Sequence, residues 1–577
     1  MDLARIIAGL RENGAEYEDV EVKRAAGGVP ETLASTMSAF ANTRGGVLIL
    51  GLDERQGFAA GGVPSPSATR DAVAGIARAS LTPPLAPSVD VMTFEGTQLV
   101  VAEVEALPPE QRPCYVTSRG LYGGSYLRVG DGDQRMTPYE IDRLREGAGQ
   151  PRWDTEPVAE ATAEDLDSRH AARLVEAARR RSVRAFAGLD DTQALTRLGV
   201  LVRHAGGLVP SLAGLLSVGA YPQQFFPQLM ITTTVFPHAE RDRPGPGGIR
   251  FLDSATITGA IPDMVADAVD AVQRNLRVVS RVIGAGRQDQ WEIEPDVIRE
   301  AIVNAVMHRD YSPQSRGTQV QVEIFPDRVT VSSPGGLFGN VRIDTLGLSE
   351  TTSSRNARLA VLLQEAGDPL TGRPVAENRG SGVSMIISRV RQDTGAVPLF
   401  TASLDQFRIT IPRRSPVTPE FLAWAERHLP GRLSAPQLAT VAIARSGHDV
   451  DLALLQRLAP DITDARAELE DLVENGILRS RKARDDGPYR ITPQLKEAPD
   501  VTTPDLAAPL EDLTAMVLSR LTEVPSASRE ELQEALAVSR SKMTRLLQDL
   551  IDRGLVATTG PPTSPNRRYQ LARPAGG

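Results

Sequence analysis

The chain contains very little cysteine: Cys114 is the only one among 577 residues. A single cysteine excludes an intrachain disulfide framework and a cysteine-based zinc site. The six histidines are scattered and show no metal-ligand spacing. Aromatic residues make up only 4% of the chain, so its hydrophobic cores must be mainly aliphatic.

Long apolar runs and an excess of basic residues are also lacking. No run of 18 apolar residues occurs and the N-terminus has no secretory signal pattern, so we expect a cytoplasmic protein without a membrane span. The formal net charge of −9 excludes a uniformly basic nucleic-acid coating but allows local basic patches. A P-loop motif is missing as well, which gives no support for a helicase motor.

The length of the chain is sufficient for about three to five domains. Stretches rich in proline and glycine near 145–161, 411–421 and 494–509 have the composition of linkers. The mixture of strand-like and helix-like patterns predicts an α+β multidomain protein. The predicted domains span residues 1–148, 160–290, 291–413, 416–494 and 508–573.

Acidic residues gather around two predicted strands near the N-terminus. In "EDVEVKR" (18–24), Glu21 and Lys23 share one strand face, Glu16 lies just before it, and Asp53 ends the apolar strand "GVLILGLD". Converging carboxylates could hold a divalent metal, with the lysine near a scissile phosphate. The alternative is a solvated strand face and a turn aspartate.

Residues 12–145 resemble the Schlafen/AlbA-type domain. The resemblance depends on "VEVKRAAGG", "STMSAFANTRGGVLILGLDERQG" and "SYLRVGDGDQRMTPYEIDRL". It implies an α/β domain that binds nucleic acid. In Schlafen nucleases, two glutamates five residues apart and a downstream aspartate form the metal site, and Glu16, Glu21 and Asp53 match that layout. The match permits nuclease activity without establishing it.

A second group of polar residues lies in "REAIVNAVMHRDYS" (299–312). Glu300, Asn304 and His308 are spaced four apart, so they share one face of a predicted helix at about 296–309. The remaining positions are largely apolar, and a polar stripe on such a helix must be solvated or satisfied. Taken alone, the stripe could be an ordinary surface feature. An earlier long helix is predicted over 262–284.

Two glycine turns follow that helix along the chain. Alternating strands are predicted at 319–326 and 328–333, and the second leads into Gly335 and Gly336, which allow close approach of the backbone to a ligand. Further on, Gly380, Ser381 and Gly382 precede an apolar helix whose free N–H groups could bind phosphate. The ordered set predicts a nucleotide site.

This order resembles the ATP-binding fold of GHKL-type proteins, and more closely its variant in RecG-like transcriptional regulators. The matching strings, within 165–413, are "REAIVNAVMHRDYS", "VTVSSPGGL", "TTSSRNARLA" and "ENRGSGV". The resemblance implies a GHKL-like α/β sandwich that binds ATP and Mg²⁺. Asn304 would hold Mg²⁺ against the phosphates, and Glu300 would orient or deprotonate the attacking water, with His308 in support. Residues 337–379 would form a lid in which Arg355 contacts phosphate.

One feature of the wider GHKL pattern is missing. Its glycine box normally begins with an aspartate that contacts the adenine amino group, whereas the corresponding stretch here is "SSPGGLF" (332–338). Asp327 lies too early to replace it. Recognition of the base must therefore be altered or supplied from elsewhere.

The C-terminal third has the rhythm of winged helix-turn-helix domains. In the last copy, basic residues lie at the front of the recognition helix and in the wing, as for a DNA reader: Arg540, Lys542, Arg545, Arg567 and Arg568. The earlier copy has an acidic second helix and a basic wing, which favours a spacer or dimerisation element. The alternative for both copies is contact with protein only.

Together these patterns predict an ATP-binding, DNA-binding transcriptional regulator, with DNA or RNA as partner, that forms a homo-oligomer. The alternative is an ATP-gated, metal-dependent nuclease that acts against foreign nucleic acid. A third hypothesis is a degenerate scaffold that binds neither nucleotide nor DNA.

Overall fold

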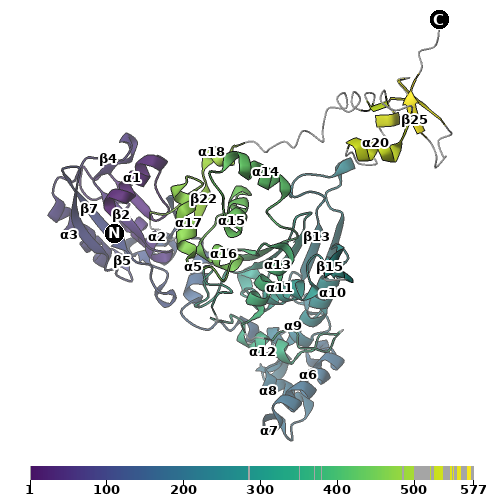
Figure 1. Cartoon of the computed structure of the whole chain (residues 1–577). Coiled ribbons are helices and arrows are strands. Elements are labelled where there is room, and N and C mark those ends of the chain that lie inside the picture. The colour runs from purple at the N-terminus through teal and green to yellow at the C-terminus, as the bar shows by residue number, and fades with distance from the viewer. Residues whose placement is uncertain are drawn as a thin grey trace. The chain divides into compact units, whose positions relative to one another are not determined.

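The computed structural model describes most of the chain (Figure 1). Described residues are 2–283, 286–349, 351–369, 371–377, 380–483, 487–498, 517, 520–521, 526–536, 543, 546–548, 550–551, 555–559 and 568–572. They divide into two units: residues 1–417 with 430–496, and residues 418–429 with 497–577. The predicted α+β multidomain class is confirmed, since helices and several separate sheets alternate along the chain.

The N-terminal part is built around a four-stranded sheet of order β1-β2-β7-β6. β1 and β2 are parallel, and the other neighbours are antiparallel. Its principal elements are α1 (Leu3–Asn13), β1 (Val20–Lys23), α2 (Leu33–Asn42), β2 (Gly46–Leu50), α3 (Pro66–Ala79), β6 (Ser88–Phe94), β7 (Thr97–Val104), β9 (Tyr126–Val129), β10 (Gly132–Arg135) and α5 (Pro138–Glu146).

Strand β2 is buried along its whole length, as its continuous apolar run predicts. Successive side chains point to opposite faces of a sheet. Leu48 and Leu50 accordingly join one apolar core, together with Phe40 of α2. Val47 and Ile49 join the other core, together with Ile7 of α1. Helices therefore cover both faces of the sheet.

The middle part contains a six-stranded sheet of order β14-β13-β17-β18-β20-β19. Only β13 and β17 are parallel neighbours. Its strands are β13 (Ile231–Val235), β14 (Asp253–Ile257), β17 (Val320–Ile324), β18 (Arg328–Pro334), β19 (Leu399–Ala402) and β20 (Gln406–Pro412). The boundary that we drew between 290 and 291 thus divides one continuous sheet, because β13 and β14 come from its N-terminal side.

Three helices pack together on this sheet: α10 (Ile261–Gln273), α11 (Pro295–Met307) and α13 (Gly382–Thr394). The other helices of this part are α6 (Ser168–Arg181), α7 (Val183–Phe186), α8 (Asp191–Leu198), α9 (Leu212–Val218) and α12 (Ala357–Glu365). One apolar core runs from residue 158 to residue 411 and holds them together.

The helix predicted over 262–284 is wrong in its second half. Helix α10 ends at Gln273, and a hairpin of β15 (Val278–Ile283) and β16 (Gly286–Trp291) follows. The apolar spacing continues past the helix end, but the residues there are mostly β-branched. Such side chains favour a paired strand over a helix.

The first copy in the C-terminal third shows the predicted order of elements, whereas much of the second copy lies outside the described residues. Helices α15 (Ala435–Arg445), α16 (Leu452–Leu458) and α17 (Ala465–Glu474) are followed by the paired strands β21 (Leu478–Ser480) and β22 (Tyr489–Ile491). The second unit contains α14 (Pro419–His428), α20 (Arg529–Leu536), β23 (Ala527–Ser528), β24 (Val556–Thr558) and β25 (Arg568–Leu571). Assignment of either copy as a winged helix stays a prediction.

Candidate nucleotide site

Helix α11 begins and packs as its sequence predicts. Pro295 occupies the first turn, where its missing N–H costs nothing. Apolar side chains at 297, 298, 301, 302 and 305 are buried on the core side. The polar stripe of Glu300 and Asn304 is left facing a cleft of about 1150 Å³.

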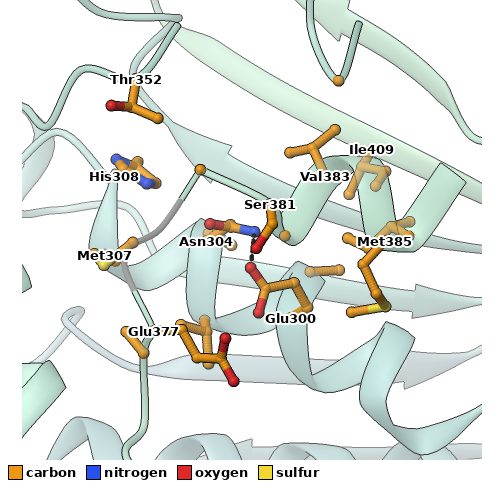
Figure 2. Close-up of a pocket in the computed structure, with 18 of the residues that line it drawn as sticks. Glu300, Asn304, Met307, His308, Thr352, Glu377, Ser381, Val383, Met385 and Ile409 are labelled. Carbon is orange, nitrogen blue, oxygen red and sulfur yellow. Dashed lines mark hydrogen bonds between the residues drawn. The ribbon is translucent and has the colours of Figure 1, made fainter. Parts of the chain in front are cut away.

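The predicted residues of two glycine turns converge on this cleft. Its lining includes Glu300, Asn304, His308, Gly335, Gly336, Gly380, Ser381 and Gly382, which the sequence analysis named. Figure 2 shows the side chains of Glu300, Asn304 and Ser381 close together, with His308 farther away at the end of α11. The structure therefore brings together residues that are up to 82 positions apart in the chain (382 − 300).

Glu300 is held by its neighbour on α11. Asn304 Nδ2 donates a hydrogen bond of 3.0 Å to Glu300 Oε1. Burial raises the pKa of Glu300 above its ordinary value, the bond from Asn304 and the charge of Arg299 oppose that rise, and the nearby carboxylate of Glu377 adds to it. A carboxyl group with a raised pKa is suited to accept a proton near neutral pH.

The N-terminus of α13 lies directly against the Glu300 carboxylate. A methyl group placed on Gly382 would come within 1.7 Å of Glu300 Oε1. The unpaired N–H groups and positive end of a helix dipole favour an anion at this point. The glycine at position 382 permits a close approach that a larger residue would prevent.

Gly335 is required for a different reason. Its φ angle of +89° is one that other residues rarely adopt, and an added Cβ would lie 2.2 Å from Arg355 Nη1. Arg355 itself is buried and does not line the cleft. It donates to Gly336 O at 3.1 Å, so in this structure it supports the glycine turn from behind rather than facing a phosphate.

His308 is neutral at physiological pH. Burial and the nearby charge of Arg355 lower the pKa of His308 to about 4. An uncharged imidazole can exchange hydrogen bonds with a ligand but provides no positive charge to a phosphate.

Ser333 is a cleft residue that sequence reasoning did not single out. It precedes Pro334 and Gly335 in the stretch that lacks the adenine-box aspartate, and it lines the cleft. Its hydroxyl donates to Ala305 O at 2.6 Å. Its place directly before the glycine turn is the only sequence signal for Ser333.

Asp310 is a second residue that sequence reasoning did not single out. It follows α11 in "HRDYS" and is fully buried. Its partners lie in distant parts of the chain, so no local pattern identifies it.

The acidic residues of the N-terminal part lie beside basic side chains, and their role in a metal site stays a prediction. Glu21 pairs with Arg128 at 2.7 Å and with Lys23, and Arg128 also lies 3.6 Å from Glu16. Asp53 instead caps the short helix that follows it, through Arg55 N–H at 3.1 Å. Among the residues that the structure describes, no three Asp, Glu, His or Cys side chains are placed to hold a metal ion.

Burial and the adjacent Glu21 raise the pKa of Glu16 to about 8, although its bond from Val22 N–H opposes the rise. Arg128 and this proton both reduce the net negative charge of the carboxyl cluster.

The predicted DNA-contacting residues lie mainly outside the described part of the chain. This applies to Arg540, Lys542, Arg545 and Arg567. Arg568 is described, and it pairs with Glu531 at 2.7 Å and donates to Ser526 O. Its charge is therefore already balanced within its own unit.

The basic wing of the first copy has a partner within the chain. Arg481 forms ion pairs with Glu18 and Asp449, and Ala483 N–H donates to Asp19 at 2.8 Å. This wing contacts the start of β1 in the N-terminal part, which fits the spacer role that we expected better than a DNA-reading role.

Comparisons with known proteins identify two segments. Residues 16–137 match the family described as "Schlafen, AlbA_2", and residues 317–411 match "Putative ATP-dependent DNA helicase recG C-terminal". A search of curated proteins finds no match. No helix in the described part of the chain is long and apolar enough to cross a membrane.

Two solved structures are similar to this chain, one over almost its whole length and the other over a smaller part of it. One is the DIP2311 protein from Corynebacterium diphtheriae, 20% identical, covering 99% of each chain with a TM-score of 0.33. The other is the N-terminal domain of a putative ATP-dependent DNA helicase RecG-related protein from Nitrosomonas europaea. It is 29% identical over 24% of this chain and 95% of its own, with a TM-score of 0.20. The chain is therefore similar to the Schlafen/AlbA_2 family over residues 16–137 and to the recG C-terminal family over residues 317–411.

Proposed function

We propose that this cleft binds ATP and that the protein is a nucleic-acid-binding regulator controlled by its nucleotide state. The observation that carries the proposal is the juxtaposition of Glu300 and Asn304 with the N-terminus of α13 and the glycine turn at 335–336. The turn and the helix end offer N–H groups to phosphate. The match to an ATP-dependent family supports the same ligand.

The side chains of α11 fit an accompanying Mg²⁺ ion. Asn304 uses its amide nitrogen toward Glu300, which leaves its oxygen, the type of ligand that Mg²⁺ prefers. Mg²⁺, when bound, would neutralise phosphate charge. Glu300 would accept a proton from the attacking water, and Asn304 would keep its carboxylate in place.

Binding of nucleotide is tested by replacing Asn304. We expect calorimetric titration with ATP·Mg²⁺ to show saturable heat for the wild type and at least a tenfold weaker affinity for Asn304→Ala. A loss of that size is on the order of one to two hydrogen bonds to charged groups. Asn475→Ala is the matched control, because Asn475 is exposed at the end of α17 and does not line the cleft. No heat with the wild type would support the scaffold hypothesis instead.

A metal-dependent nuclease stays the alternative function, although Arg128 engages Glu21 of its predicted metal site in this structure. The N-terminal part is proposed to bind nucleic acid rather than cut it, as its Schlafen/AlbA_2 match suggests. Oligomer formation and regulation of transcription belong to the same proposal.

A further inference from the structure

A buried ion pair joins the N-terminal part to the segment that follows α11. Arg143 of α5 lies 2.7 Å from Asp310, and the two side chains are 3% and 0% exposed. Tyr139 donates to the same carboxylate at 2.8 Å and Ser315 at 2.7 Å. Although burial opposes ionisation, the N–H of Ser312 and the charge of Arg143 lower the pKa of Asp310. The pair is charged, and it joins residues 167 positions apart.

Asp310 packs against the glycine turn at 335–336, on the side away from the cleft. Its N–H donates to Pro334 O at 2.8 Å. A Cβ on Gly335 would lie only 2.6 Å from Asp310 Cβ, so the turn packs on Asp310 without spare room. Any shift of Asp310 must therefore move the turn or strain it.

The linker after α5 contacts the segment that precedes α12. Gln150 Nε2 donates to Ser354 O at 3.0 Å and to Arg355 O at 2.7 Å, in the segment that the sequence predicts as a lid. Asp154 accepts from Arg358 N–H at 2.8 Å, at the start of α12. One short stretch of the chain thus reaches both the glycine turn, through Asp310, and the base of the lid.

We propose that α5 and residues 147–155 position the nucleotide cleft, with Arg143 acting through Asp310 on the glycine turn at 335–336. The cleft then depends on α5, which directly follows the Schlafen/AlbA_2 match at residues 16–137, and changes in the N-terminal part are coupled to the cleft. The coupling to nucleotide rests on the proposed function, whereas the positioning of the turn does not. Arg143 touches no ligand in this scheme, so it is a positioning residue.

The test uses the full chain and two arginines of the same helix. Arg143→Met removes the partner of a buried carboxylate, which is strongly destabilising locally. Arg145→Met is the matched control, because Arg145 is exposed in the last turn of α5. Arg143→Lys keeps the positive charge. Amide hydrogen exchange is measured on each protein without nucleotide, and the affinity for ATP·Mg²⁺ is then measured by calorimetry.

We expect exchange at residues 335–336 and 353–355 to accelerate at least tenfold in Arg143→Met and to stay at the wild-type rate in Arg145→Met. Nucleotide affinity should fall by roughly 5- to 150-fold, the usual range for coupled sites. Arg143→Lys should recover part of both effects. Acceleration spread over the whole chain would show simple unfolding and would overturn the positioning role.

The two levels of the proposal fail in different ways. Unchanged exchange in Arg143→Met overturns the positioning of the turn, whatever the nucleotide does. Faster local exchange with unchanged nucleotide affinity overturns the coupling alone. Faster local exchange in a protein whose wild type binds no nucleotide supports the positioning role and rejects the proposed function.

Discussion

At the scale of single residues, the neighbours of Glu300 determine the pKa of its carboxyl group. Burial and the Glu377 carboxylate raise its pKa, whereas Asn304 and Arg299 oppose the rise. A general base must lose its proton before it can act. We therefore expect the rate of ATP hydrolysis to increase with pH through a value above the ordinary glutamate pKa of about 4.3. Glu300→Gln should lower the rate by roughly 10²- to 10⁴-fold.

Replacing Glu377 tests why the pKa of Glu300 is raised. Removing its charge in Glu377→Gln should shift the rising limb of the kcat/KM profile to lower pH, since one of the causes that raise the pKa of Glu300 is gone. Glu160→Gln, at an exposed position outside the cleft, should leave the profile unchanged. A limb that does not move, or that persists in Glu300→Gln, would assign the titration to another group.

At the scale of elements, the approach of α13 to α11 is set by a missing side chain. Gly382→Ala places a methyl group within 1.7 Å of Glu300 Oε1, so we expect a loss of roughly 1–3 kcal/mol in stability and weaker nucleotide binding. Thermal melting of the single and double variants measures this. Glu300→Ala combined with Gly382→Ala should restore part of the loss, because the clash is removed.

Gly75→Ala is the control for the intrinsic effect of the substitution. Gly75 lies on the exposed side of α3 with nothing within 4 Å of an added Cβ, so alanine there should be neutral or stabilising by up to about 1 kcal/mol. Additive losses in the Glu300/Gly382 double variant would mean that the two residues do not interact, and the described packing of α13 would be wrong.

The helices and strands around the cleft show which elements the sequence could predict. Helix α11 was predicted nearly to its ends, because Pro295 and the apolar spacing both act locally. The sequence predicts helix α10 too long at its C-terminal end. The apolar spacing continues after Gln273, but the β-branched residues there form the first strand of a hairpin. The Arg143–Asp310 pair could not be predicted, because its two residues meet only through the tertiary fold.

At the scale of the whole molecule, the candidate cleft and the Schlafen/AlbA_2 domain are connected by the α5 linker within one unit. A ligand can shift an equilibrium only by its different affinity for the two states, and the effect is reciprocal. If nucleotide closes the lid over the cleft, the linker transmits that change to the N-terminal sheet. On the proposed coupling, the same connection would carry an effect of bound nucleic acid back to the cleft.

We therefore expect the affinity of the full chain for nucleic acid to change by roughly 5- to 150-fold between the nucleotide-free and ATP-analogue-bound forms. Fluorescence anisotropy with labelled single- and double-stranded DNA and RNA measures this at one fixed salt concentration, because phosphate contacts make such affinities strongly salt-dependent. Asn304→Ala should bind nucleic acid like the nucleotide-free wild type, with or without the analogue. Equal affinities in both forms of a wild type that demonstrably binds nucleotide would reject nucleotide control, and cleavage of the probes with Mg²⁺ or Mn²⁺ would support the nuclease alternative.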